Sequence, residues 1–304
     1  MRRPSSSGDL LADRRFGYAQ DLLDAGEAEA AADLLQQVLE LVPEWPPVWL
    51  ALGDAYEQSG QINAAASAFR RALLLAPDDV LGAGPRLARL GETHATMTPG
   101  YVAALFDDYA ERFDTHLVQA LAYRGPAIII EALQDVCRQQ QRDFCFGPVL
   151  DLGCGTGLMA AVIQGQAQTI YGVDLSPRMV EKARETGLYT SVHCGELLAF
   201  LEAWTPASYD LALAADVLVY LGDLSPLMGA MQRVLAPAGL FAFTVQACDG
   251  ARFQLGHDLR YHHSADYLRR TAQHHGLQVA HLAPCVTRQD AGQPVPGFVV
   301  VLTH

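Results

Sequence analysis

The sequence feature that most constrains the fold is a short apolar run followed at once by three alternating glycines. The stretch reads VLDLGCGTGL from residue 149 to residue 158, with glycines at 153, 155 and 157. The apolar run predicts a buried parallel strand. The glycines predict a tight turn in which the backbone can approach a ligand before a helix begins at Thr156. Because glycines in any strand-to-helix turn can produce this pattern, a functional interpretation depends on the rest of a βαβ unit.

The residues after the glycine turn complete this unit. Thr169 to Val173 predict a second strand that ends on Asp174, about 20 residues beyond the loop, where an acid can accept hydrogen bonds from both ribose hydroxyls of an adenosine. Ser176 and Pro177 then predict the cap and first turn of a helix over 176–187. Asp151, just before the glycines, would repel a pyrophosphate but can pair with an amino group. The pattern therefore disfavours a dinucleotide.

The two motifs together resemble the signature of class I S-adenosylmethionine-dependent methyltransferases. They read DLGCGTG at 151–157 and DLSPRM at 174–179. The resemblance implies an α/β fold with a Rossmann-like seven-stranded methyltransferase sheet over residues 143–304, whose terminal strand is antiparallel. It also implies S-adenosyl-L-methionine as the cofactor.

The same resemblance implies which residues bind this cofactor. Asp151 would hold the methionine amino group, Asp174 the ribose, and Glu196, after a strand predicted at 190–193, the adenine amino group, although Asp is the commoner residue there. The expected pocket residues are Asp151, Gly153, Cys154, Gly155, Gly157, Asp174, Leu175, Met179, Gly195, Glu196, Leu197 and Asp216, together with Tyr109 and Phe113 from an upstream helix. The backbone of Cys154, rather than its sulfur, is the expected contact.

A repeat of 34 residues occupies the N-terminal part of the sequence. Gly26, Ala31, Leu35 and Pro43 recur 34 positions later as Gly60, Ala65, Phe69 and Pro77. This period, and a second copy that includes Trp49, Gly53 and Tyr56, resemble the tetratricopeptide repeat. A small all-α tetratricopeptide-repeat domain is therefore expected over 12–95, between a flexible N-terminus at 1–11 and a helical lid or linker at 96–142.

Two repeats are too few to bury a continuous core, because about three or more are usually needed. Residues 78–92 are expected to add one more helix as a cap, interrupted at Pro85. The repeats are interpreted either as a platform for a protein partner or the substrate, or as an intramolecular brace or a surface for self-association.

An aromatic stripe follows between Tyr101 and Leu117, where the aromatic residues have helical spacing. This stretch resembles the segment ahead of the catalytic domain in bacterial proteins that join tetratricopeptide repeats to a methyltransferase domain. That resemblance implies that Tyr101, Tyr109 and Phe113 cover the mouth of the cofactor pocket. The alternative is an N-terminal helix that merely packs on the sheet. Further helices are predicted over 117–122 and 126–141.

The candidate acceptor site follows the last parallel strands. A fourth strand is predicted to end in Asp216, where it and Tyr220 can face the methyl group or the substrate, and a fifth strand is predicted at 240–245. Arg260, Tyr261 and His263 come after it and resemble the Arg-Tyr-x-His-Ser element of the same repeat-linked group. They are the candidate catalytic residues, because such groups can orient an oxyanion or take a proton. The alternative is a cluster that caps the helix after Ser264 and solvates a loop.

The end of the sequence predicts two more strands, at 278–282 and 298–303. They are expected to form a hairpin, with the Pro- and Gly-rich link at 284–297 turning between them.

Composition limits the partners and the compartment. At 304 residues with 50% hydrophobic residues, the chain can bury a sizeable core. A formal charge of −13 argues against nucleic acid or an anionic membrane as the main partner. No signal-peptide pattern or transmembrane stretch occurs, so a cytoplasmic protein is expected. The six cysteines include no Cys-x-x-Cys pair, so free thiols and no metal site are expected.

These patterns favour an enzyme that transfers a methyl group from S-adenosylmethionine to a hydroxyl, carboxylate or amine of a small molecule, peptide or carrier-bound intermediate. The alternative is a non-catalytic repeat scaffold whose Rossmann-like domain binds the cofactor and serves protein–protein interaction. A nicotinamide-dependent dehydrogenase is disfavoured by the loop pattern. No residue in the sequence selects the acceptor.

Overall fold

The structure of the protein is a computed structural model that describes residues 6–92, 97–111, 113, 123–290 and 292–304. The chain divides into two compact units, Met1–Val102 and Ala103–His304. None of the described helices combines the length and the hydrophobicity that a membrane-spanning segment requires.

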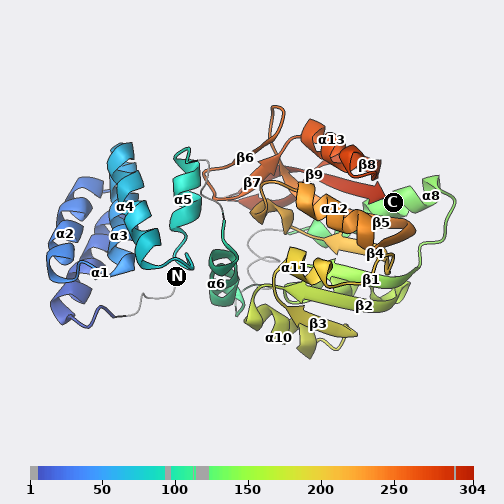
Figure 1. The fold of residues 1–304 in the computed structure, drawn as a ribbon, viewed down its shortest axis with the longest axis horizontal. Helices are drawn as coiled ribbons and strands as arrows, with labels where there is room; N and C mark the ends of the chain where they lie inside the picture. The colour runs from blue at the N-terminus through green and yellow to red at the C-terminus, as the bar shows by residue number, and fades with distance from the viewer. Residues whose placement is uncertain (1–5, 93–96, 112, 114–122, 291) are drawn as a thin grey trace. The chain divides into compact units, whose positions relative to one another are not determined.

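The first unit consists of helices in antiparallel pairs, in blue to teal in Figure 1. Two helix–turn–helix pairs are followed by a single short helix, so the helical repeat predicted from the 34-residue period is confirmed. The helices are α1 (Leu10–Asp24), α2 (Ala28–Leu41), α3 (Pro46–Gln58), α4 (Ile62–Leu75) and α5 (Ala83–Arg89). Helix α1 begins inside the stretch expected to be flexible, because the side chain of Asp9 accepts hydrogen bonds from the backbone of Leu11 and Ala12.

A glycine allows α3 and α4 to approach closely. A Cβ atom on Gly53 would lie only 2.3 Å from the ring of Phe69, which is fully buried. The small residue at this position in the repeat is therefore required by the packing of the large one on the facing helix.

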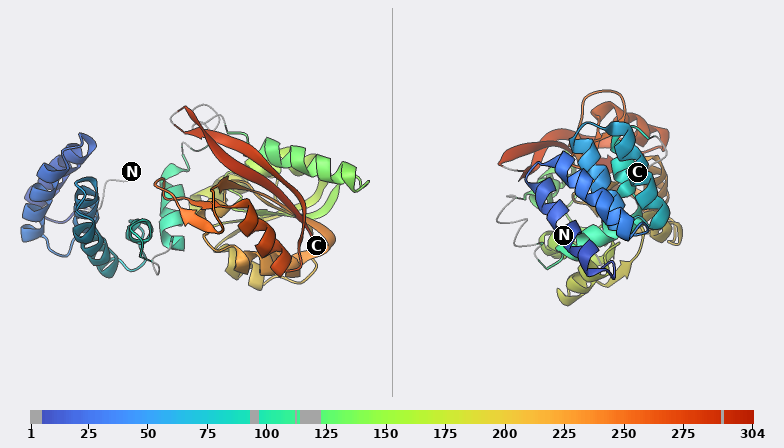
Figure 2. Two further views of the ribbon diagram at one scale, coloured as in Figure 1. Left: turned by 90° about the horizontal axis from the view of Figure 1, so that it is seen from above. Right: turned by 90° about the vertical axis from the view of Figure 1, so that its left-hand side faces the viewer.

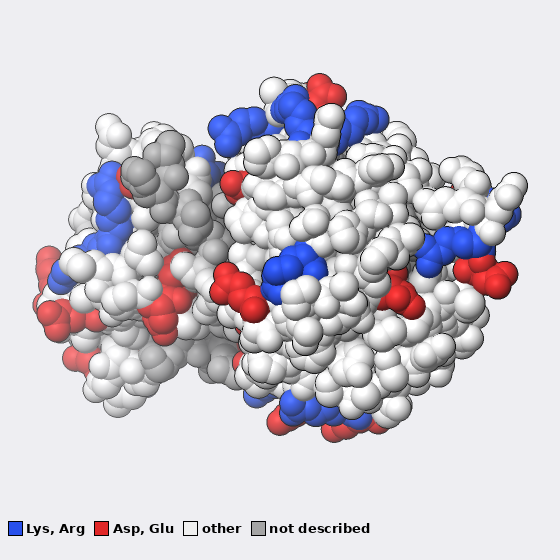
Figure 3. All heavy atoms as spheres, turned by 45° about the vertical axis from the view of Figure 1, so that its right-hand side comes forward, with Lys and Arg blue, Asp and Glu red and all other residues white. Residues whose placement is uncertain are grey.

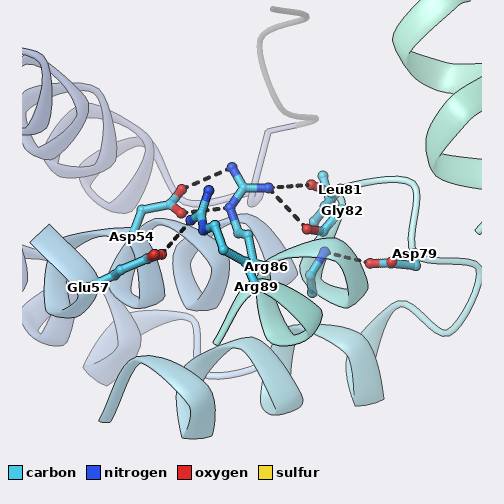
Figure 4. Close-up of polar contacts among 8 residues, drawn as sticks. Asp54, Glu57, Asp79, Leu81, Gly82, Arg86 and Arg89 are labelled. Atoms are coloured by element: carbon cyan, nitrogen blue, oxygen red, sulfur yellow. Dashed lines mark hydrogen bonds and ion pairs between the residues drawn. The ribbon is translucent and has the colours of Figure 1, made fainter. Parts of the chain in front are cut away.

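Charged side chains join α5 to the second repeat. Arg86 and Arg89 of α5 point toward Asp54 and Glu57 of α3 (Figure 4), with nitrogen–oxygen distances of 2.6 Å in both pairs. Both guanidinium groups are largely buried, which strengthens the attraction compared with an exposed pair. Helix α5 thus follows the second repeat as the predicted cap.

The expected interruption at Pro85 is wrong. Pro85 is the third residue of α5, in the first turn, where its missing N–H would be unpaired in any case. The free N–H groups of Ala83 and Gly84 are satisfied instead by the buried carboxylate of Asp79, at 2.6 and 2.9 Å.

The second unit contains a nine-stranded sheet within the described residues, two strands more than expected. Strands β3-β2-β1-β4-β5 run parallel in that order. Strand β9 is antiparallel between β5 and β8, as the resemblance implied for a terminal strand. The strands are β1 (Phe146–Leu152), β2 (Ala167–Asp174), β3 (Ser191–Cys194), β4 (Tyr209–Ala214), β5 (Leu235–Ala247), β6 (Phe253–Leu255), β7 (Tyr261–His263), β8 (Gln278–Asp290) and β9 (Gln293–Thr303).

Helices cover both faces of this sheet. On one face, α8 (Gly125–Gln139) and α9 (Leu158–Ile163) pack on alternate residues of the central strands. On the other face lie α11 (Leu197–Glu202), α12 (Ser225–Val234) and α13 (Ala265–His274). Figure 2 (left) shows α8 in green and α13 in orange-brown on opposite sides of the strands. The predicted Rossmann-like α/β class is therefore confirmed.

Three further helical segments lie near the ends of the strands. They are α10 (Pro177–Glu185) and the short 3₁₀ turns Gln164–Gln166 and Leu218–Tyr220. The aromatic stretch forms α6 (Pro99–Tyr109). The helix predicted at 117–122 and the part of the stripe at 112 and 114–117 lie outside the described residues.

The two unexpected strands, β6 and β7, lie at the edge where the parallel strands end. Gln246 of β5 pairs with Gly297 of β9 and also with His262 of β7. Strand β9 pairs with one edge of β5, and β4 pairs with the other edge as far as Phe243. Beyond the end of β4, β7 pairs with this second edge of β5. Arg260 and the residues of β7 are thereby placed at the carboxyl edge of the sheet, close to the end of β4.

Several predicted boundaries differ from the structure: β5 begins at Leu235 rather than at 240, and two further differences affect the site. Strand β4 ends at Ala214 rather than Asp216, because the backbone at Asp216 has a positive φ of 60° that no strand accommodates. The link at 284–297 is not a loop, because most of its residues belong to β8 and β9 and extend the hairpin. Pro294 and Pro296 pair with β8 but not with β5, so one edge of β9 has no strand beside it here and tolerates residues without an N–H group. The hairpin therefore projects past the end of β5.

The glycine contact predicts opposite effects for two substitutions in the first unit. Gly53→Ala is expected to lower the free energy of unfolding by about 1–3 kcal/mol, because the added methyl group overlaps the Phe69 ring. Gly17→Ala, in the middle of α1 with no atom within 4 Å, is the matched control and should raise it by about 1 kcal/mol through helix propensity. Urea unfolding followed by tryptophan fluorescence measures both. Stabilisation by both substitutions would contradict the packing argument.

Candidate active site

The glycine loop after β1 has the backbone geometry that only glycine adopts readily. Gly153, Gly155 and Gly157 have φ angles of +62°, +53° and +97°. A Cβ on Gly153 would also lie 2.4 Å from a methyl group of Val217, which follows β4. The loop therefore lies close to the end of β4, and helix α9 begins at Leu158, two residues later than predicted.

Asp174 fastens this loop to the end of β2. One carboxylate oxygen accepts a hydrogen bond from the backbone N–H of Gly155 at 2.8 Å, and the other accepts from that of Ser176 at 2.9 Å. The side chain is buried, and burial raises the pKa of its carboxyl group. The predicted ribose ligand is thus held rigidly between the glycine loop and α10.

Asp151 lies at the end of β1, buried beside the same loop. The hydroxyl of Tyr189 donates to its carboxylate at 2.7 Å, and burial raises its pKa to about 7. The prediction from sequence missed Tyr189, which also packs against Gly157 and Gly172. No motif marks this tyrosine, because its only signal is an aromatic residue in the turn after α10.

The remaining predicted pocket residues differ in what their side chains do. Three of them are buried among apolar neighbours: Cys154, Met179 and Leu197. Because the Cys154 side chain packs in an apolar cluster with Val180, only the backbone of this cysteine is available to a ligand. Leu175 and Gly195 lie at the ends of β2 and β3, where the Gly195 N–H donates to the backbone carbonyl of Asp174. Their contact with the cofactor stays a prediction.

Glu196 has a second role in the structure. Its carboxylate accepts a hydrogen bond from the backbone N–H of Ala199 at 2.7 Å and so caps the N-terminus of α11. It follows β3 as predicted, at the same sheet edge as Asp174. The expected bond from Glu196 to an adenine amino group stays a prediction.

An aromatic cluster lies beside the glycine loop. Phe106 and Tyr109 of α6 contact Phe113 edge-on, and Phe106 also contacts Tyr220 after β4, with ring centroids 5.4 Å apart in the last pair. A Cβ on Gly155 would lie 3.7 Å from the Phe113 ring. Tyr109 and Phe113 are therefore next to the loop, whereas Tyr101 is elsewhere: its ring packs against Gly82, in the first unit.

Asp107 joins α6 to the cofactor motif, although no sequence pattern marks this residue. The Ser176 hydroxyl donates to its carboxylate at 2.5 Å, and the backbone N–H of Arg178 donates to the same oxygen at 3.3 Å. A carboxylate at the N-terminus of α10 is favoured by the helix dipole. This contact holds α6 against the start of α10, directly beside Asp174.

Asp216 marks the acceptor side of the loop. Its backbone N–H donates to the Thr244 hydroxyl at 2.9 Å, and its carboxylate forms an ion pair with Arg288 of β8 at 2.5 Å. The Arg288 side chain is only 4% exposed and that of Asp216 is 17% exposed, so this pair is largely buried. Arg288 was missed because residues 284–297 were expected to be a turn.

The three predicted catalytic residues point to two different sides of β7. Tyr261 and His263 lie on the buried side, where the His263 ring stacks on Tyr267 and its Nε2 lies 3.0 Å from the Gly222 carbonyl oxygen. Burial lowers the pKa of His263 to about 4, so it is neutral near pH 7. Alternation along the strand places Arg260 and His262 on the opposite side. Arg260 lies close enough to Asp216 for the charge of that carboxylate to act on it, whereas the His263 ring faces the Gly222 carbonyl.

The donor set at the loop suits a cationic ligand. Asp151 and Asp174 are both buried, and within the described ranges neither forms an ion pair with a Lys, Arg or His side chain. A buried carboxylate without a cation is costly, and the ammonium group of the ligand would compensate Asp151. Asp174 keeps its two backbone hydrogen bonds and would accept from the ribose. The residues present therefore fit S-adenosylmethionine.

Comparison with known families agrees with this geometry. Residues 150–243 match the family model of a methyltransferase domain, and residues 22–84 match that of a tetratricopeptide repeat. The chain thus carries a methyltransferase domain of the S-adenosylmethionine-dependent class preceded by tetratricopeptide repeats, which confirms the family predicted from the two motifs.

The individual relatives match only about a third of this chain, at 30–33% sequence identity. A ubiquinone biosynthesis O-methyltransferase of Xylella fastidiosa is 30% identical over 101 residues, which are 32% of this chain and 41% of that protein. A malonyl-[acyl-carrier protein] O-methyltransferase of Salmonella typhimurium is 33% identical over 108 residues, 35% of this chain and 41% of that protein. The chain therefore spans less than half the length of these relatives. A solved 1,6-didemethyltoxoflavin-N1-methyltransferase of Burkholderia thailandensis is 19% identical, with a TM-score of 0.49, over 67% of this chain and 88% of that one.

The raised pKa of Asp151 predicts that cofactor affinity depends on pH. With a pKa of about 7 in the free protein, this carboxyl group is mostly ionised at pH 8 and mostly protonated at pH 6. An ammonium group binds the ionised form, so the affinity for S-adenosylhomocysteine should fall as the pH drops below 7, by up to about tenfold per pH unit. Calorimetric titration at pH 6, 7 and 8 measures this. Asp151→Asn should remove the dependence, and an equally steep dependence in that variant would assign it to another group.

Proposed function

We propose that the chain transfers a methyl group from S-adenosylmethionine to a nucleophilic oxygen of a small molecule or carrier-bound group. The observation that carries the proposal is the pair of buried carboxylates, Asp151 and Asp174, on either side of a loop whose three glycines have positive φ angles. When bound, the cofactor supplies a methyl group made electrophilic by the sulfonium.

Each part of the site has a defined task in this reaction. Asp151, oriented by the Tyr189 hydroxyl, pairs with the ammonium group of the ligand. Asp174 accepts from the ribose while its bonds to Gly155 and Ser176 fix the loop in place. The aromatic rings of Phe106, Tyr109 and Phe113 exclude water from the neighbourhood of the loop, which strengthens the electrostatic interactions there. Alignment of donor and acceptor then provides most of the rate enhancement.

The relatives favour oxygen among the acceptor atoms considered. Both curated relatives described above are O-methyltransferases by name, one in ubiquinone biosynthesis and one that acts on a malonyl-[acyl-carrier protein]. The repeats are proposed to bind a protein partner, such as the carrier of the acceptor, or a second copy of the chain. Nucleic acid is not proposed as a partner, because the formal charge of the chain is −13. On the face drawn in Figure 3, both basic and acidic side chains are present.

The proposal predicts a specific loss of cofactor binding in one variant. Asp174→Asn should weaken binding of S-adenosylhomocysteine by at least about tenfold, because the amide cannot accept from the ribose and from Gly155 and Ser176 as the carboxylate does. Calorimetric titration of the wild-type chain and the variant measures the difference.

Asp210→Asn is the matched control. Asp210 also accepts a hydrogen bond from a backbone N–H, that of Gly147 at 2.7 Å, but at the opposite end of the sheet. It should leave the affinity unchanged. Absence of binding to the wild-type chain would contradict the proposal, and binding without transfer to any acceptor would favour the non-catalytic scaffold.

A further inference from the structure

Helix α1 exposes the face that the second repeat uses to pack on the first. On α3, this face consists of four residues that are buried in one apolar cluster with residues of α1 and α2: Val48, Ala51, Leu52 and Ala55. The 34-residue period gives α1 the same place in its repeat that α3 has in the next one. Within the described residues α1 is the first helix, and Figure 1 shows α1 and α2 at the end of the stack away from α5. The equivalent face of α1 is therefore a packing surface that no described helix covers.

The residues on this face of α1 are not those of a purely polar end. Counting back 34 positions from the four residues of α3 gives Arg14, Gly17, Tyr18 and Asp21, whose helical spacing places them on one face. Tyr18 is 71% exposed, and Leu11, one turn before Arg14, is 51% exposed. A Cβ on Gly17 would meet no atom within 4 Å, so there is open space beside the tyrosine. A terminal repeat that faces only water carries a polar outer face. The exposed tyrosine and leucine therefore indicate a contact with another molecule.

The charges on this face make it complementary to itself. Arg14 and Asp21 are both exposed, and neither forms an ion pair within the described part of the chain. Suppose that two α1 helices pack antiparallel about a twofold axis that passes between Gly17 and Tyr18. Arg14 then faces Asp21 of the second copy, and Gly17 gives room to Tyr18 of the second copy. A parallel pair would instead place Arg14 against Arg14 and Asp21 against Asp21, which like-charge repulsion disfavours.

We propose that the repeats join two copies of the chain, with this face of α1 packed antiparallel on the same face of the second copy. The inference rests on the part of the proposed function that gives the repeats a partner, and it selects the second copy because the face complements itself. It does not depend on methyl transfer. One pair of 15-residue helices forms a small interface, so the expected affinity is micromolar rather than nanomolar.

Reversal of the charges tests the pairing. Sedimentation equilibrium of the full chain at micromolar concentrations should show a monomer–dimer equilibrium. Arg14→Asp and Asp21→Arg should each raise the dissociation constant of the dimer by at least about tenfold, because each variant brings two pairs of like charges together. The double variant Arg14→Asp/Asp21→Arg should dimerise like the wild-type chain, because it only exchanges the two charges.

A mixture of the two single variants tests the antiparallel arrangement. In a dimer of one Arg14→Asp chain and one Asp21→Arg chain, both pairs have opposite charges, so the mixture should associate although neither variant does alone. Asp33→Arg is the matched control and should leave the equilibrium unchanged. Asp33 is an exposed acid of α2, one turn before Gln36, whose side chain donates a hydrogen bond to Tyr56 of α3. It therefore lies on the side of α2 that faces the second repeat.

The outcomes separate this inference from the proposed function. A wild-type chain that stays monomeric, single reversals that leave the dimer unchanged, or a double variant that fails to dimerise would each overturn the inference. Calorimetric titration with S-adenosylhomocysteine should give the same affinity for all variants, which also shows that they are folded. A dimer that does not bind this ligand would contradict the proposed methyl transfer alone, and a monomer that binds it would overturn the dimer alone.

Discussion

The catalytic unit depends on the hydrogen bonds that Asp174 makes at the end of β2. Its carboxylate accepts from the loop after β1 and from Ser176, the N-cap of α10, and its backbone carbonyl accepts from Gly195 just after β3. One residue therefore connects the carboxyl ends of three neighbouring strands. Because this carboxylate is buried, it can neither rotate to other partners nor be replaced by water, which fixes the loop without help from a ligand.

The acceptor side is built differently, from segments far apart in the sequence. Asp216 is 72 residues from Arg288, and the two meet only because the β8–β9 hairpin extends beyond the end of β5. The backbone at Asp216 has a positive φ, an uncommon conformation that proteins retain mainly where the surroundings fix it. Here the Thr244 hydroxyl and the Arg288 guanidinium fix it, one through the backbone and one through the side chain.

Local motifs explain what the sequence could and could not predict. The glycine loop, Asp151 and Asp174 follow from short patterns with fixed spacing, and the parallel strands follow from apolar runs. Tyr189, Asp107 and Arg288 bind partners 38, 69 and 72 residues away, and no local pattern encodes such pairs. Strand β7 shows a further limit: it has polar residues on both sides, so the sequence cannot tell whether His262 or His263 faces the site. Only its pairing with β5 decides this.

The position of β9 has a consequence for folding during synthesis. This strand lies between β5 and β8, yet both of its neighbours precede it in the chain. Until residues 293–303 have left the ribosome, one edge of β5 has no partner and β8 has no place in the sheet. An unpaired apolar edge of this kind invites association with other chains. The nascent protein therefore passes through a stage in which the strands that carry the cofactor loop can already pair, while the edge of β5 that faces away from β4 is still open to aggregation or to a chaperone.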